Sequence, residues 1–207
     1  MYFRKKKLDY DIFIPPYNKE FNKMTKDEAN EYFEWYKDNI NNRIIYLESY
    51  SNLKLDYSVE SLVDIWGWFL KKAEIEKTPF IRLMELRKQL KGQPKEIKKD
   101  IINEQKYQLS LQTEYIIRDI AMYFGEVYIK NNNSIYWGYH TNIHADSFAN
   151  MPVLMGFEDR DFTPPFKAYF ELNFEIRNVA YNIFDGDQKD TDLLDAYNRW
   201  KRMVYNS

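Results

Sequence analysis

The sequence predicts a mainly α-helical protein with a small two-stranded β element in its C-terminal half. Apolar residues recur at steps of three and four over most of the 207-residue chain, which is the spacing of one helical face. The chain has only six glycines and seven prolines, and this scarcity favours long regular elements over a turn-rich β-sandwich. The pattern changes in residues 134–157, which contain short apolar and aromatic runs of strand length.

Two parts of the chain are distinguished. Residues 1–24 are expected to form an extended N-terminal segment, and residues 25–207 are expected to form a single α-rich domain. The stretch from Asp11 to Tyr17 is typical either of a short edge strand stopped by prolines or of a tail laid across the body. No internal repeat or low-complexity linker divides the remainder.

A helix over residues 26–50 is predicted from a capping box. The Thr25 hydroxyl can accept a hydrogen bond from the backbone amide of Glu28, whose side chain can reach back to the Thr25 amide. The apolar residues of one helical face follow, from Ala29 to Leu47.

Four further helices are predicted from their start and stop signals. Ser58 can cap the second, and Pro79 can begin the third because proline at the first helical position loses no needed hydrogen bond. Gly92 can end the third helix in the left-handed conformation. Pro94 can begin a charged fourth helix, and the fifth spans residues 110–130. No proline or glycine separates the fourth and fifth, so one continuous rod is an alternative.

After the fifth helix the period of the pattern changes. Apolar and aromatic runs at residues 135–139 and 152–157 predict two strands joined by a long loop rich in turn formers. Residues 166–184 are then predicted to be helical, with a turn at Asp185–Asp187. Thr191 can cap the last helix.

Composition excludes several classes of protein. The chain has no cysteine, so disulfides, thiol catalysis and cysteine-based metal sites are impossible. Neither a signal peptide nor a membrane-spanning run of about 20 apolar residues is found, and a soluble, cytoplasmic protein without a membrane partner is expected.

Residues 131–207 hold 7 Lys and Arg against 11 Asp and Glu, whereas residues 1–130 hold 23 against 21. This gradient is too shallow for a nucleic-acid surface. Phosphate-loop, dinucleotide and serine-hydrolase motifs are missing, and no cofactor is expected.

One cluster has the residue types of a metal site. His140 and His144 are four apart, and Asp146 follows. Such a set could hold an ion on a helix and would support a metal-dependent or carboxylate-based enzyme, the alternative function. The surrounding residues are typical of a loop and lack the glutamate of the usual motif. Loop histidines that bond to backbone or solvent are therefore the favoured interpretation, and no metal is expected.

The carboxylates of the fifth helix allow two interpretations. Asp119 and Glu126 are seven residues apart and share a face, so they could act as acid and base if that face lined a cleft. The favoured interpretation is structural: Glu114 pairs with Arg118 at four-residue spacing, and the other acids face water.

The end of the fifth helix and the region after it resemble small bacterial proteins of the immunity type. The resemblance lies in Phe124-Gly-Glu126, a polar turn, Trp137, and the later run from Asn150 to Phe157 with Pro152 and its glycine, and it covers about a quarter of the chain. It implies a non-enzymatic protein that binds and neutralises a toxin. It implies no catalytic residue.

The sequence thus favours a non-enzymatic binding protein whose partner is another protein, of basic character. Tyrosine and tryptophan, which are common interface anchors, are abundant, with 18 Tyr and 5 Trp, although core packing also explains them. The acidic C-terminal third could meet a basic partner. The candidate binding residues lie near the first strand and in the acidic turn: Glu126, Trp137, Tyr139, Asp185, Asp187 and Asp190. The oligomeric state stays open.

Overall fold

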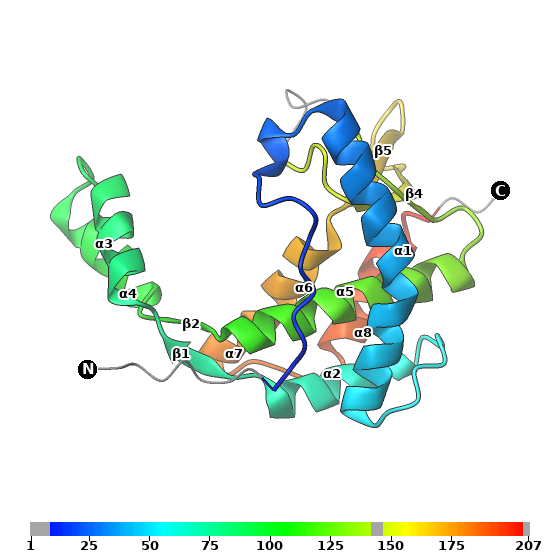
Figure 1. Ribbon diagram of the computed structural model, residues 1–207, viewed down its shortest axis with the longest axis horizontal. Coiled ribbons are helices and arrows are strands. Elements are labelled where there is room, and N and C mark those ends of the chain that lie inside the picture. Colours follow the sequence, from blue (N-terminus) through cyan, green and yellow to red (C-terminus); the bar gives the residue numbers. More distant parts are fainter. Residues whose placement is uncertain (1–8, 142–146, 205–207) are drawn as a thin grey trace.

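The computed structural model describes residues 9–141 and 147–204, which are mainly helical with two small antiparallel sheets (Figure 1). The predicted fold class is confirmed. The α-helices are α1 (Lys26–Ser51), α2 (Ser61–Lys72), α3 (Phe80–Gln89), α4 (Lys95–Glu104), α5 (Leu111–Asn131), α6 (Leu172–Ala180), α7 (Asn182–Asp185) and α8 (Asp192–Lys201). The strands are β1 (Ile75–Lys77), β2 (Tyr107–Leu109), β3 (Tyr136–Gly138), β4 (Val153–Asp159) and β5 (Phe166–Phe170).

Helix α5 forms the centre of the body, and α1, α2 and α6 pack against it. It begins where predicted, because the Ser110 hydroxyl accepts a hydrogen bond from the Thr113 amide at 3.2 Å. Its apolar residues lie on more than one face, as expected for a helix covered from several sides. Ile116, Ile120 and Phe124 are fully buried.

Helix α1 crosses α5 (Figure 1), and its predicted capping box is present. The Glu28 amide donates to the Thr25 hydroxyl at 3.2 Å, and the Glu28 carboxylate accepts from the Thr25 amide at 2.7 Å. The helix ends at Asn52, which has a left-handed backbone with φ of 56°. The predicted boundaries are therefore correct to within one residue.

Residues 9–24, here called the strap, lie across α1 and α5 (Figure 1). Tyr10 and Phe13 are buried, and the Phe13 ring stacks on Trp35 with 4.2 Å between ring centroids. The strap forms no strand in its described residues. Of the two alternatives for this segment, the tail across the body is the one observed.

The β element of the C-terminal half has three antiparallel strands in the order β3-β4-β5. The two predicted strands are present as β3 and β4. The prediction of a helix from residue 166 is wrong at its start, because residues 166–170 pair with β4 and α6 begins only at Leu172. Tertiary contacts decide this: Phe170 pairs with Leu154 and stacks on Trp200 with 4.3 Å between centroids.

Residues 75–109, here called the arm, project from the body as a helical hairpin on a two-stranded ribbon (Figure 1). Strands β1 and β2 are antiparallel, with Ile75 opposite Leu109 and Lys77 opposite Tyr107. Gly92 has the predicted positive φ, +103°, but it lies in the turn after α3, which already ends at Gln89 with Leu90 as its cap. The alternative of one rod through α4 and α5 is wrong, because β2 leaves the helical path to pair with β1.

Helices α2 and α8 pack against each other, and α2 also packs against α5. Helix α2 begins at Ser61, three residues after the predicted Ser58 cap, whose hydroxyl accepts from the Ser61 amide at 3.3 Å. Helix α8 follows Thr191 as predicted, although the Thr191 side chain makes no capping hydrogen bond. No helix within residues 9–141 and 147–204 is long and apolar enough to cross a membrane.

Candidate functional site

Three of the predicted binding residues meet where β3 packs on α1 and α5. The Trp137 indole donates to the Glu126 carboxylate at 2.8 Å, and its ring lies against Gly125. The Tyr139 hydroxyl donates to the Asn30 side chain at 3.0 Å. The structure therefore brings Glu126, Trp137 and Tyr139 together in a joint between elements, each with a partner inside the chain.

Asp119 takes part in a buried ion pair. The Arg43 guanidinium donates to the Asp119 carboxylate from Nη2 at 2.6 Å and from Nε at 3.0 Å, and the Tyr10 hydroxyl donates at 2.5 Å. Burial raises the pKa of the Asp119 carboxyl against the opposing effect of Arg43. Burial alone would lower the pKa of Arg43, but its hydrogen bonds and attraction to Asp119 raise it. This pair attaches the strap and α1 to α5.

Both sequence-based interpretations of the α5 carboxylates are corrected by these contacts. Asp119 and Glu126 do not face one cleft, because one binds Arg43 and the other binds Trp137. Glu114 does not pair with Arg118. It pairs with Arg177 of α6, at 2.7 Å from Nη2 and 2.9 Å from Nε. The partners come from distant segments, which the helical spacing within α5 cannot indicate.

Two residues of the metal-like cluster, His144 and Asp146, lie outside the described residues. The His140 ring packs against Tyr169 with 4.9 Å between ring centroids, and its carbonyl accepts from the Asn150 amide at 2.7 Å. Within the part of the chain that the structure describes, no group of three or more His, Asp or Glu side chains is arranged to hold a metal ion.

The acidic turn is present and its three aspartates are exposed. Gly186 has a φ of +70° at the end of α7, so the turn begins where predicted. Asp185 lines a cleft beside the arm. Asp190 lies instead against α2, since a Cβ added at Gly67 would come within 3.2 Å of its Cγ. The turn therefore presents its acids to two sides of the body.

The cleft at the root of the arm has a volume of about 520 Å³. Its apolar lining comes from both the arm and the body, and includes Tyr107, Leu111, Tyr181 and Phe184, which are 37–53% exposed. The rings of Tyr181 and Phe184 lie 5.7 Å apart between centroids. These two aromatic residues are not among the predicted binding residues, although their spacing of three residues next to the acidic turn is a signal that the sequence contains.

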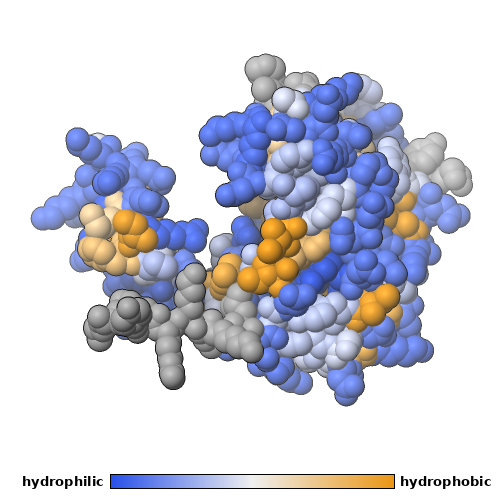
Figure 2. Space-filling model, in the orientation of Figure 1, coloured by the Kyte–Doolittle hydropathy of each residue, from blue (hydrophilic) through white to orange (hydrophobic). Residues whose placement is uncertain are grey.

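The arm itself leaves apolar side chains uncovered. Helices α3 and α4 contain no buried residue, and Phe80, Ile81 and Ile97 are 69%, 64% and 48% exposed. Figure 2 shows apolar surface on the arm and again on the body across from it. Exposed apolar groups that gather on one projecting element are typical of an interaction surface.

Replacing Phe80 and Ile81 by serine is expected to change the free energy of unfolding by no more than about 0.5 kcal/mol, because both side chains already contact solvent. Urea unfolding followed by circular dichroism measures this. Ile120→Ala in α5, a fully buried position, is the contrasting variant, with an expected loss of about 2 to 5 kcal/mol. A comparable loss in the serine variant would mean that the arm's apolar face contributes to folding.

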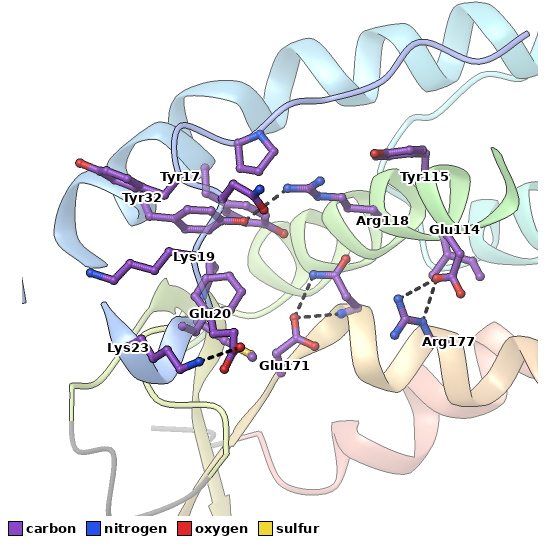
Figure 3. Close-up of a pocket in the computed structure, with 18 residues that line it drawn as sticks. Tyr17, Lys19, Glu20, Lys23, Tyr32, Glu114, Tyr115, Arg118, Glu171 and Arg177 are labelled. Carbon is purple, nitrogen blue, oxygen red and sulfur yellow. Dashed lines mark hydrogen bonds and ion pairs between the residues drawn. The ribbon is translucent and has the colours of Figure 1, made fainter. Parts of the chain in front are cut away.

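A second and larger cavity, of about 820 Å³, lies between the strap, α5 and α6 (Figure 3). Its lining is rich in charged groups and tyrosines. Arg177 and Glu114 form their ion pair at one side, and the Lys23 ammonium pairs with Glu20 at 2.9 Å on the strap. Glu114 lines this pocket and the cleft, so the two hollows lie on neighbouring faces of α5.

Fold and surface together define an α-rich body that carries a projecting helical hairpin, with an apolar cleft where the two join. No known protein family matches this chain. No similar curated protein and no similar solved structure was found either. The function is therefore inferred from the geometry of the molecule.

Proposed function

We propose that this protein is a non-enzymatic binding protein whose cleft takes an apolar, basic segment of another protein. The observation that carries the proposal is the set of four exposed apolar side chains at the cleft, contributed by the arm and by the body. Large apolar groups held open on both sides of a concave surface are favourable anchors for a partner, because water leaves them when they are covered.

The charge of the cleft indicates the character of the partner. Glu104 and Asp185 line it, and neither has an ion-pair partner among the described residues. Arg82 is the cationic residue of the lining, and it donates to Gln108 at 3.3 Å. The acidic turn and the net charge of −4 over residues 131–207 add further negative charge to that of the cleft. A basic segment would meet complementary charge.

The contacts of the α5 carboxylates favour binding over catalysis. Asp119 is held by Arg43, Glu126 by Trp137 and Glu114 by Arg177. Each of these acids joins two elements of the scaffold through its partner, so none of the three carboxylates is left without a contact inside the chain. The biological form proposed for the binding is neutralisation of a toxin by direct contact, as the resemblance to immunity-type proteins suggests.

The double charge reversal Glu104→Lys/Asp185→Lys tests the proposal. The probe is a 20-residue amphipathic helical peptide rich in lysine and leucine, and binding is measured by fluorescence anisotropy at low and at physiological salt. We expect the reversal to weaken binding about tenfold or more, because two unpaired carboxylates become two cations. We also expect the affinity of the unchanged protein to fall with salt.

The matched control is Asp38→Lys/Asp161→Lys, which changes the net charge equally at exposed positions outside the cleft. It should bind the peptide within about twofold of the unchanged protein at physiological salt, where distant surface charges are screened. If both variants lost the same amount of affinity for the peptide, the effect would come from the net charge of the protein, and the cleft would not be the binding site. If the protein bound an acidic peptide of the same length more tightly, the proposal that its partner is basic would be wrong.

A further inference from the structure

Arg118 of α5 lies in the pocket between the strap, α5 and α6, and its guanidinium has spare hydrogen-bonding capacity (Figure 3). It donates to the Phe13 carbonyl and to the Tyr32 hydroxyl, each at 3.3 Å, at the long end of the range for such bonds. A guanidinium carries five N–H donors. No carboxylate within residues 9–141 and 147–204 lies within 4.0 Å of it.

The other cations that line this pocket are paired. Arg177 binds Glu114 through two nitrogens, at 2.7 and 2.9 Å. Lys19 pairs with Glu28 at 2.6 Å and Lys23 pairs with Glu20 at 2.9 Å. Arg118 is thus the cation of the described lining whose charge is not paired with a carboxylate.

The buried acid of the lining, Glu171, is already engaged. Glu171 caps α6, with its carboxylate accepting from the Phe174 amide at 2.7 Å and from the Asn173 side chain at 2.9 Å. These hydrogen bonds hold the Glu171 carboxylate at the N-terminal end of α6. The side-chain oxygen of Asn173 is buried and accepts no hydrogen bond from any described residue. Asn173 lines the pocket, so this oxygen is an unfilled acceptor at its wall.

Tyrosines supply the rest of the recognition surface. Tyr17, Tyr32, Tyr36 and Tyr115 line the pocket and give it aromatic faces. Burial raises the pKa of Tyr36 well above its ordinary value and also raises that of Tyr32 against the effect of Arg118. Both phenols therefore remain neutral at physiological pH. The volume, about 820 Å³, lies within the range for small-molecule sites.

We propose that this pocket binds a small molecule that combines an oxyanion, a hydrogen-bond donor and an aromatic or apolar body. The oxyanion, a carboxylate or a phosphate, binds Arg118 because a guanidinium matches both groups with paired N–H donors. The donor binds the Asn173 oxygen, and the body lies against the tyrosines. This site is distinct from the cleft, and Glu114 is the residue that lines both.

Four probes test the proposal by isothermal titration calorimetry with the full chain. Phenylalanine and 3-phenylpropionate carry a carboxylate with and without an amino group, phenyl phosphate carries a phosphate, and 3-phenyl-1-propanol is neutral. We expect binding of at least one anionic probe and none of the alcohol. A preference for phenyl phosphate or for the carboxylates assigns the oxyanion.

Variants then assign the residues. Arg118→Gln should weaken the anionic probe about tenfold or more, because a charge-assisted contact is lost, whereas Arg118→Lys should retain part of the affinity. Arg87→Gln, with the same change in charge on the exposed surface of the arm, should bind as the unchanged protein does. Asn173→Ala should weaken phenylalanine and leave 3-phenylpropionate unchanged.

The outcomes separate this site from a purely structural Arg118. If Arg118→Gln lowers the melting temperature but does not change the affinity of the anionic probe, the arginine only attaches the strap and the proposal fails. Binding of no anionic probe by the unchanged protein at millimolar concentration also overturns it. If Arg118→Gln does not fold, the affinity of the anionic probe for Arg118→Lys is compared with its affinity for Arg87→Gln. Equal affinities in these two variants would then overturn the proposal. If the test of peptide binding at the cleft failed, these results would be unaffected, since Glu104 and Asp185 do not line this pocket.

Discussion

Asp119→Ala is expected to lower the free energy of unfolding by about 3 to 5 kcal/mol, because it removes the buried counter-charge of the Arg43 guanidinium and leaves only the exposed Asp11 carboxylate, 4.0 Å away. Asp119 is 0% exposed and Arg43 is 6% exposed, so water cannot replace the lost carboxylate. The Tyr10 hydroxyl loses its acceptor in the same step. Urea unfolding followed by tryptophan fluorescence and circular dichroism measures the change.

The matched control is Glu114→Ala, which removes the acid of the partly exposed pair with Arg177. Its expected effect is about 0 to 1 kcal/mol, since solvent screens such a pair. The double replacement Arg43→Met/Asp119→Leu should recover most of the stability lost in Asp119→Ala, because it removes both buried charges. If Asp119→Ala were no more destabilising than Glu114→Ala, the buried pair would not be the main attachment of the strap.

Gly125→Ala is expected to destabilise the protein by about 1 to 3 kcal/mol through overpacking. A Cβ at this position would lie 2.3 Å from Cζ2 of Trp137 and 3.0 Å from Cδ1 of Leu172. Alanine in a helix interior is otherwise favoured over glycine by about 1 kcal/mol, so a loss of stability reports the contact with the indole. Thermal and urea unfolding measure the change.

Repeating Gly125→Ala in a Trp137→Leu background isolates that contact. The smaller side chain removes the overlap with the indole, and the added methyl is then expected to be neutral or to stabilise by up to about 1 kcal/mol. The sign of the effect should therefore change between the two backgrounds. An equal loss in both would place the conflict at Leu172 or in the helix backbone.

The parts of the fold that the sequence predicted are those set by local chemistry. Thr25 and Glu28 are three residues apart, so their reciprocal hydrogen bonds fix the start of α1 without help from the rest of the chain. Strand β5 was mistaken for a helix because its conformation depends on pairing with β4 and on the Phe170–Trp200 stack. Neither contact is visible in the spacing of residues 166–170.

The same distinction limits prediction of the candidate site. The approach of Arg43 to Asp119 joins positions 76 residues apart in the chain, and no pattern within α5 indicates it. Tyr107 reaches the cleft because β2 reverses the chain before α5, whereas the sequence allowed a continuous rod at that point. Asp185 was selected for its charge, and its place beside exposed aromatics follows only from the packing of α7.

The ribbon at the root of the arm determines how separable that element is. The chain leaves and re-enters the body at residues that face each other, with Ile75 opposite Leu109, and α3 and α4 contribute no buried side chain. The segment between the paired strands thus has the geometry of an insertion. A hairpin of other length or sequence could therefore stand at this position without a change in the core, and under the proposed binding function such an exchange would alter the partner that is bound.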